Sequence, residues 1–273
     1  MKSSGQLPHS WVDSLIMRIV TWNVNSLNAR LERVEEWISK LKPDVLCLQE
    51  TKLSNDDFPH QVFNDMGYET AHHGQGQWNG VAILSQVGLE DVRPDFADGG
   101  DPDPDARILW ATCGGVRVAT CYVPNGRSLD DDHYAYKLNW LDRLLDDLNT
   151  NASPKDDIAI VGDFNIAPDD RDVYDPKGLV GVTHTSSAER DKLTALSEWG
   201  VTDCFRDDHE AAGLYSWWDY RDGNFHKRKG MRIDLICLSE SLRTNKHRVF
   251  IDRNARKGKL PSDHAPVVAD IAR

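Results

Sequence analysis

Residues 17–50 read MRIVTWNVNSLNARLERVEEWISKLKPDVLCLQE and contain, in order, a strand, a helix and a second strand. The first strand is Met17–Trp22, and the second is the buried apolar run Asp44–Gln49, which ends at Glu50. Between them, apolar residues recur three or four positions apart, as on one face of a helix; they are Leu31, Val34, Ile38 and Leu41. This alternation is typical of an α/β domain.

The same alternation continues along the chain. Further strands are expected at Gly80–Leu84, Val116–Val123, Ile158–Val161, Arg232–Leu238 and Ala265–Ile271, and further helices at Tyr134–Leu148 and Lys192–Trp199. The acidic, glycine- and proline-rich segment Asp95–Asp105 is expected to be a surface loop. We predict one α/β domain over residues 17–273, with two sheets covered by helices. Residues 1–16 lack a secretory signal and are expected to be a dispensable extension.

Composition places limits on the class of protein. The chain has 273 residues, 40% of them hydrophobic, and no apolar run long enough to span a membrane. Its five cysteines form no C-x-x-C pair, and four of them lie in apolar runs, so we expect buried free thiols and a cytoplasmic protein. The net charge of −12 argues against a nucleic-acid partner. However, Arg221–Lys259 holds twelve Lys and Arg against four Asp and Glu, so a basic face remains possible on an acidic body.

Polar side chains fall repeatedly at or beside the apolar runs: Asn23, Glu50, Asp163, Asn165, Asp234, Asp263 and His264. A carboxylate among apolar neighbours is costly to bury unless it is paired or bound to a metal. Gathered at one edge of the sheets, these groups would form an acidic pocket suited to Mg²⁺ or Mn²⁺ rather than zinc. Such a pocket would orient water and neutralise charge on a phosphoryl group.

Most of these residues, taken singly, also have a structural interpretation. Asn23, Asp163 and Asn165 could shape turns, and Glu50 could cap a helix or be a surface charge. Ser262, Asp263 and His264 could cap the segment that follows them. Asp234 is the hardest to explain in this way, because it stands between Ile233 and Leu235 in an apolar strand.

Eight segments together resemble exonuclease III and its abasic-endonuclease relatives, within the endonuclease/exonuclease/phosphatase superfamily. They run in family order from Met17 onward and are TWNVNSLNAR (21–30), LQETK (48–52), WNGVAILS (78–85), YVPNG (122–126), GDFNIAP (162–168), SWWDYR (216–221), GMRID (230–234) and PSDHAPV (261–267). GDFN and SDHAPV occur across the superfamily, whereas LQETK, SWWDYR and GMRID are specific to the DNA-repair branch. The resemblance implies a four-layer α/β sandwich, with two mixed sheets packed face to face and helices outside.

The resemblance also implies roles for the polar residues. Asp163 would orient and deprotonate the attacking water, His264 would stabilise the developing charge, and Asp234 would fix the imidazole ring. Tyr122 and Asn165 would contact the phosphate, which completes the expected catalytic set. Glu50 would be the principal metal ligand, and the whole expected metal region consists of Asn23, Glu50, Asp163, Asn165 and Asp263.

By the same resemblance, Trp217, Met231 and Ile233 would line a small apolar pocket for a sugar without a base. Relatives often carry a bulkier aromatic residue at the position of Met231, so the shape of this pocket differs here. Core packing is the alternative role for Ile233. Lys227 and Arg228 are expected to contact the DNA backbone.

The expected function is that of a DNA-repair nuclease, a 3′–5′ exonuclease and 3′ end-cleaning enzyme that also incises 5′ to abasic sites. Its partner would be double-stranded DNA with abasic sites or blocked 3′ ends, and it would act as a monomer with no membrane attachment. One alternative is a superfamily relative that hydrolyses inositol phosphates or phospholipid head groups. Another is a binding module without catalysis, which would have lost at least one pocket residue; none is missing.

Overall fold

The computed structural model describes residues 16–272 and contains two six-stranded mixed sheets. The first sheet has the order β11 (Lys246–Ile251), β12 (Val267–Ala272), β1 (Ile16–Asn23), β2 (Val45–Gln49), β4 (Val81–Ser85) and β3 (Glu69–His73). The second has the order β5 (Glu90–Pro94), β6 (Ile108–Cys113), β7 (Val116–Tyr122), β8 (Ile158–Asp163), β10 (Asp234–Ser239) and β9 (Val201–Asp203). The suggested extension lies almost wholly outside the described residues.

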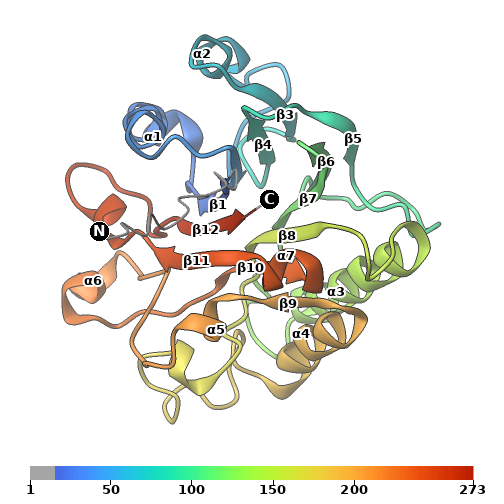
Figure 1. Cartoon of the computed structure of the whole chain (residues 1–273). Coiled ribbons are helices and arrows are strands. Elements are labelled where there is room, and N and C mark those ends of the chain that lie inside the picture. Colours follow the sequence, from blue (N-terminus) through green and yellow to red (C-terminus); the bar gives the residue numbers. More distant parts are fainter. Residues whose placement is uncertain (1–15, 273) are drawn as a thin grey trace, which may run out of the picture.

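Four of the helices lie on the outer faces of the two sheets (Figure 1), whereas Phe205 and Leu242, from two short helices, belong to the core between the sheets. The helices are α1 (Leu27–Leu41), α2 (His60–Asp65), α3 (Asp132–Asn151), α4 (Ser187–Trp199), and the short α5 (Phe205–Asp208), α6 (Asn224–Lys227) and α7 (Glu240–Thr244). Three 3₁₀ turns complete the set: η1 (Asp170–Asp172), η2 (Arg221–Gly223) and η3 (Arg253–Arg256). Helices α1 and α2 cover the first sheet, and α3 and α4 cover the second.

Three hydrophobic layers alternate with these elements. In β1, Met17 and Ile19 belong to the core between the sheets, whereas Val20 and Trp22 belong to the core under α1 and α2. Successive side chains of a strand point to opposite faces, so a strand buried on both sides is apolar throughout. The same division holds in the second sheet, where alternate residues of β8 face the first sheet or α3 and α4. The expected four-layer sandwich is confirmed.

Every predicted strand and helix is present, with shifted ends. The strand predicted from Arg232 begins at Asp234, because the Arg232 amide donates to the Asp172 carbonyl instead of joining the sheet. The strand predicted from Ala265 begins at Val267, since Ala265 donates to the Ser216 carbonyl and Pro266 has no amide hydrogen. Among the strands that were not predicted, β6 is a buried apolar run, whereas β3, β5, β9 and β11 are short or largely polar.

Part of the positive charge of the basic segment Arg221–Lys259 is paired internally. Many of its cations are bound to carboxylates elsewhere in the protein, and others stack on aromatic rings. The ion pairs join Arg221 to Asp219, Arg232 to Asp172 and Asp203, Arg243 to Asp207, Lys246 to Asp208, and Arg248 to Asp270. Arg253 and Arg256 lie over Phe225. The charge available to a partner is therefore smaller than the sequence count indicates.

The expected surface loop Asp95–Asp105 lies between β5 and β6, outside any strand or helix. All five cysteines are buried thiols outside any disulfide, as predicted. Within residues 16–272, no helix has the length and apolar character needed to cross a membrane.

Candidate active site

The sheet topology gathers the polar residues at one edge of the sandwich, which we call the acidic edge. Strands β1 and β2 are parallel, as are β7 and β8, so Asn23, Glu50, Tyr122 and Asp163 all stand at carboxyl ends of strands. Strand β10 is antiparallel to β8, so its first residue, Asp234, is the Cα partner of Asp163. Strand β12 is antiparallel to β1, which brings the preceding His264 to the same edge.

His264 and Asp234 form a buried pair. The Nδ1 atom of His264 lies 2.9 Å from the nearer carboxylate oxygen of Asp234, and Asp234 is completely buried. Burial lowers the pKa of His264, but the carboxylates of Asp234 and Asp163 outweigh this effect and raise the pKa to about 10. The imidazole is therefore a cation at neutral pH, with its Nε2 edge facing the Asp163 carboxylate at 3.7 Å.

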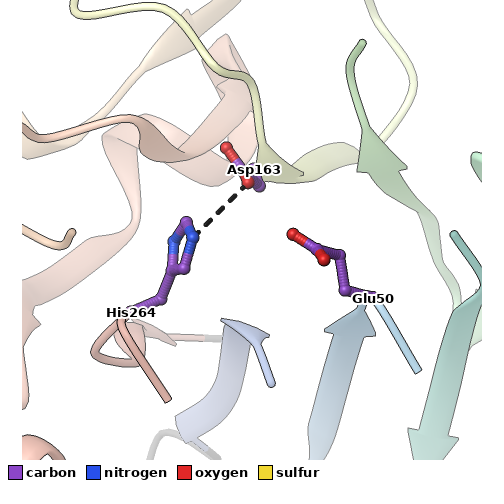
Figure 2. A group of neighbouring side chains, drawn as sticks. All are labelled: Glu50, Asp163 and His264. Atoms are coloured by element: carbon purple, nitrogen blue, oxygen red, sulfur yellow. Dashed lines mark ion pairs between the residues drawn. The ribbon is translucent and has the colours of Figure 1, made fainter. Parts of the chain in front are cut away.

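Asp163 and Glu50 face the same space as His264 (Figure 2). The Asn23 amide joins the two carboxylates, because its Nδ2 donates to Glu50 and to Asp163 at 2.9 Å each. Burial raises the pKa of Asp163 to about 7, against a lowering by His264, and Asp234 adds to the increase. Asp163 can thus accept a proton near neutral pH.

The backbone turns sharply directly after β2 and β8. Glu50 has φ 51° and Asn165 has φ 52°, both in the left-handed region that residues other than glycine rarely adopt. In the GDFN segment, a Cβ on Gly162 would lie 2.0 Å from the Cys121 carbonyl oxygen, so only glycine allows β7 and β8 to approach here. Backbone conformations of this kind cluster at functional sites.

Tyr122 and Asn165 lie beside this acidic group. Burial raises the pKa of Tyr122 well above its usual value, and the Glu50 and Asp163 carboxylates add to the effect. The guanidinium of Arg107 lies 4.8 Å from the centre of the Tyr122 ring. Asn165 donates from Nδ2 to the Val123 carbonyl, and its backbone amide donates to Asp163. Both residues are therefore held at the edge of the predicted pocket.

The donor set fits a hard divalent cation. Ligand atoms of Glu50, Asp163 and His264 all lie within 4.8 Å of one another. A protonated imidazole has no lone pair for a metal, so the raised pKa of His264 leaves the carboxylates, with amide oxygens nearby, as the donors. Oxygen donors suit Mg²⁺ or Mn²⁺. Glu50 and Asp163 would hold the metal.

Asp263 lies slightly apart from this group. Its carboxylate accepts hydrogen bonds from Asn25 Nδ2 at 3.0 Å and from Trp217 Nε1 at 3.1 Å. Burial raises the pKa of Asp263, but His264 and these two donors outweigh it and lower the value. Asp263 thus connects the acidic edge to Trp217, while its role as a metal ligand stays a prediction.

The three predicted pocket residues lie together. Trp217, Met231 and Ile233 form a small hydrophobic cluster with Ala167, Val173 and Leu179. The backbones of Trp217 and Met231 exchange two hydrogen bonds of 2.9 Å, and the Trp217 ring centre lies 6.5 Å from that of His264. The buried positions of Met231 and Ile233 also fit core packing, whereas Trp217 is partly exposed. We call these three residues the apolar wall; their role as a pocket stays a prediction.

Lys227 and Arg228 are exposed at the end of α6, and neither joins an ion pair within the described residues. Several contributors to the site were not assigned from the sequence. Lys52 binds Glu50 at 3.0 Å and Asn25 at 2.6 Å, and Asn125 donates to the Asn165 side chain. Lys52 and Asn125 lie within LQETK and YVPNG, so these motifs were the available signal; Arg107, Val173 and Leu179 had none.

The chain is similar to known proteins over nearly all of the two-sheet domain. Residues 20–264 match the model of the Endonuclease/Exonuclease/phosphatase family. The chain is 32% identical to exodeoxyribonuclease III of Haemophilus influenzae, over 93% of this chain and all of that protein. It superposes with a TM-score of 0.90 on a 3′ phosphatase from Neisseria bound to a product DNA hairpin, at 39% identity over 94% of this chain and all of that one.

An AP endonuclease from Archaeoglobus fulgidus gives the same TM-score of 0.90, at 34% identity over 93% of this chain and 99% of that one. The fold and the site thus define a phosphodiester hydrolase with two sheets and an acidic edge. The chain belongs to the endonuclease/exonuclease/phosphatase family, within its exonuclease III and AP endonuclease branch.

Proposed function

We propose that this DNA-repair nuclease incises duplex DNA 5′ to abasic sites and removes nucleotides or blocking groups from 3′ ends, using Mg²⁺ or Mn²⁺. The observation that carries the proposal is that three features lie together at one edge of the sheets. They are the charged His264, the Asp163 carboxylate with its pKa near neutrality, and the apolar wall. The DNA substrate is supported by similarity to exodeoxyribonuclease III, to a 3′ phosphatase and to an AP endonuclease.

The chemistry is hydrolysis by an oriented water molecule. Asp163, held by the Asn23 amide and facing the His264 ring, takes the proton of the attacking water. The imidazolium of His264, fixed by Asp234, donates to a phosphoryl oxygen as negative charge develops, and Tyr122 and Asn165 hold the phosphate. A divalent metal bound by Glu50 and Asp163, with Asn23, Asn165 and Asp263 close by, would supply neutralisation of the phosphoryl charge.

Selectivity for a damaged site comes from the apolar wall. A sugar without a base loses less stacking when it leaves the helix than a normal nucleotide does. Trp217, which is partly exposed, presents a surface against which such a sugar can pack next to His264, and it clusters with the buried Met231 and Ile233. Lys227 and Arg228 contact the DNA backbone outside this wall.

We further propose that residues 17–273 act as one catalytic domain, as a monomer in the cytoplasm. All of the site residues belong to one two-sheet unit, which supports a single catalytic domain. Five buried thiols outside any disulfide are typical of a reducing compartment.

The proposal is tested with two labelled duplexes that differ only in one abasic-site analogue, each assayed with Mg²⁺, with Mn²⁺ and with excess EDTA. Incision 5′ to the analogue should require the metal, and Glu50→Gln should raise the metal concentration needed for half activity. A third duplex with a 3′-phosphate measures end cleaning. Full incision in EDTA would refute the metal requirement, and equal cleavage of both duplexes would refute the abasic specificity.

A further inference from the structure

Behind the acidic edge lies an ion pair that the chemistry above does not use. Lys137 on α3 and Glu189 in the first turn of α4 are both completely buried, and their Nζ and Oε1 atoms are 2.5 Å apart. Replacing a buried ion pair with apolar residues is often neutral or stabilising, so such a pair is weak evidence for a purely stabilising role. The other contacts of Lys137 and Glu189 therefore indicate the role of the pair.

The Lys137 ammonium points at the two segments that carry site residues. Its Nζ donates to the Asn165 carbonyl at 2.7 Å and to the Asn125 carbonyl at 3.2 Å, and it also contacts Thr183 Oγ1 at 3.4 Å. Asn125 lies in the segment after β7, and Asn165 lies in the segment after β8. One cation thus joins the backbones that follow two neighbouring strands of the second sheet.

Glu189 organises the remaining donors around the same carbonyls. Its Oε1 accepts from Thr183 Oγ1 and from the His184 amide at 2.9 Å each, and its Oε2 accepts from Ser186. The His184 ring then donates from Nδ1 to the Asn165 carbonyl at 2.5 Å. The Asn165 carbonyl therefore has two donors, the Lys137 ammonium and the His184 ring.

This arrangement determines which way Asn165 faces. With its carbonyl directed inward at Lys137 and His184, Asn165 adopts the left-handed backbone, and its amide side chain meets Val123 and Asn125 at the pocket edge. Its backbone amide donates to Asp163 Oδ1 at 2.9 Å. A shift of the Asn165 backbone would thus also move the carboxylate that accepts the proton from water.

The Asn125–Gly126 backbone packs tightly against the Lys137 side chain. A Cβ on Gly126 would lie 2.8 Å from Thr183 Oγ1 and 3.1 Å from Lys137 Cδ, so the Asn125–Gly126 segment lies directly on the lysine side chain. Both Asn125 and Asn165 are held by this one buried network, which spans α3, α4 and the segments after β7 and β8.

We propose that Lys137 and Glu189 are positioning residues, which hold the Asn125 and Asn165 carbonyls so that Asn165 and Asp163 keep the geometry needed for phosphodiester hydrolysis. The inference rests on the proposed function only in assigning roles to Asn165 and Asp163. The pair acts through these residues and does not touch the substrate.

The test compares Lys137→Met with the double variant Lys137→Met/Glu189→Gln, in which the glutamine oxygen can still accept from the His184 amide. The single variant leaves a buried carboxylate without its cation, so it should lose thermal stability. The double variant removes both charges, and each carbonyl keeps one donor, His184 for Asn165 and Thr183 for Asn125. Its thermal midpoint should therefore recover toward the parent. Its kcat should remain roughly 10- to 100-fold low, because small misplacements of catalytic groups have effects of this size, while KM changes little.

The matched control is a second ion pair on the same helix, between Arg93 and Asp147, which packs on the side of α3 toward Ala97. Arg93→Met/Asp147→Leu should lower the thermal midpoint but leave kcat unchanged. All rates are measured well below the midpoint of each variant. If the double variant at Lys137 and Glu189 has parental kcat, the pair is only structural and the inference is wrong.

Failure of this inference is distinct from failure of the proposed function. The parent protein is assayed first on the abasic duplex, the 3′-phosphate duplex and bis(p-nitrophenyl) phosphate. If it acts only on the last, the proposed substrate is wrong, but the kcat comparison among variants still decides the role of Lys137 and Glu189.

Discussion

Two aspartates of this site have different pKa values because their surroundings differ. Asp163 is buried next to other carboxylates, which raises its pKa to about 7. Asp263 accepts hydrogen bonds from Asn25 and Trp217 near the His264 cation, and its pKa falls below the usual value despite burial. At the scale of single residues, the environment therefore separates a proton acceptor from a carboxylate that stays ionised.

Asp234→Asn should lower kcat by about 10²–10³-fold, the loss expected when one preorganised donor is no longer held in place. It should also shift the alkaline limb of the pH–rate profile to lower pH. Against the lowering by burial, Asp234 and Asp163 together raise the pKa of His264 to about 10, so removing the Asp234 charge lets the imidazole lose its proton earlier as pH increases. The profile of kcat and the titration of His264 by NMR measure both effects.

The control for Asp234→Asn is Asp270→Asn, which changes a buried aspartate paired with Arg18 and Arg248 outside the site. It should change stability but not the pH–rate profile. A parental rate and an unchanged profile for Asp234→Asn would show that Asp234 only supports the fold. Asp163→Asn should differ from both by abolishing turnover at every pH.

At the scale of elements, the site depends on where strands end. Glu50 and Asn165 turn into the left-handed region immediately after β2 and β8, which directs their side chains out of the sheet edge. The wall next to them is held differently, by Arg232 between Met231 and Ile233. Arg232 is completely buried and binds Asp172 at η1 and Asp203 on β9. Its neighbours in the chain therefore cannot move independently of these elements.

Arg232→Met should lower the free energy of unfolding by roughly 3 kcal/mol, because it removes a completely buried cation that bridges Asp172 and Asp203 and leaves Asp172 with Arg206 alone. Denaturation by urea measures this change. Arg243→Met, which removes a cation from a half-exposed pair with Asp207, should cost less than about 1 kcal/mol. Equal effects of the two substitutions would contradict the anchoring role of Arg232.

At the scale of the whole molecule, the acidic net charge of −12 has to be reconciled with a DNA substrate. Five cations of the basic segment are paired with carboxylates, so the others, among them Lys227 and Arg228, are left to bind phosphates. Lys227 and Arg228 are exposed and lie on a segment that leads into Met231 and the apolar wall. Local contacts between these cations and DNA phosphates, rather than the electrostatic field of the whole protein, would then hold the duplex.

Affinity for duplex DNA should fall as salt increases, with a modest slope of log affinity against log salt. Lys227→Ala/Arg228→Ala should reduce that slope by roughly one for each phosphate that the variant no longer binds. Arg243→Ala removes the same kind of charge from the same segment but from an internal ion pair, so it should leave the slope unchanged. A slope that does not change in the double variant would exclude these residues as phosphate ligands.

The sequence alone indicated most of the fold and the residues of the acidic edge. Long apolar runs such as Asp44–Gln49 and Ile158–Val161 predicted buried strands, because a strand covered on both faces has no polar alternation. Short polar strands such as β3 and β9 lack that signal and form only because a partner strand is already in place. Strand and helix ends shifted where backbone groups found partners in distant segments.

What the sequence determined by itself is the set of chemical groups and their order: carboxylates and amides directly after apolar strands, and SDH before the last one. What only the tertiary structure decided is their environment. The proximity of Asp234 to His264, the raised pKa of Asp163 and the burial of Lys137 against Glu189 all depend on segments far apart in the chain. Local patterns record propensity and periodicity, whereas burial and electrostatic coupling depend on distances that exist only after the two sheets have packed together.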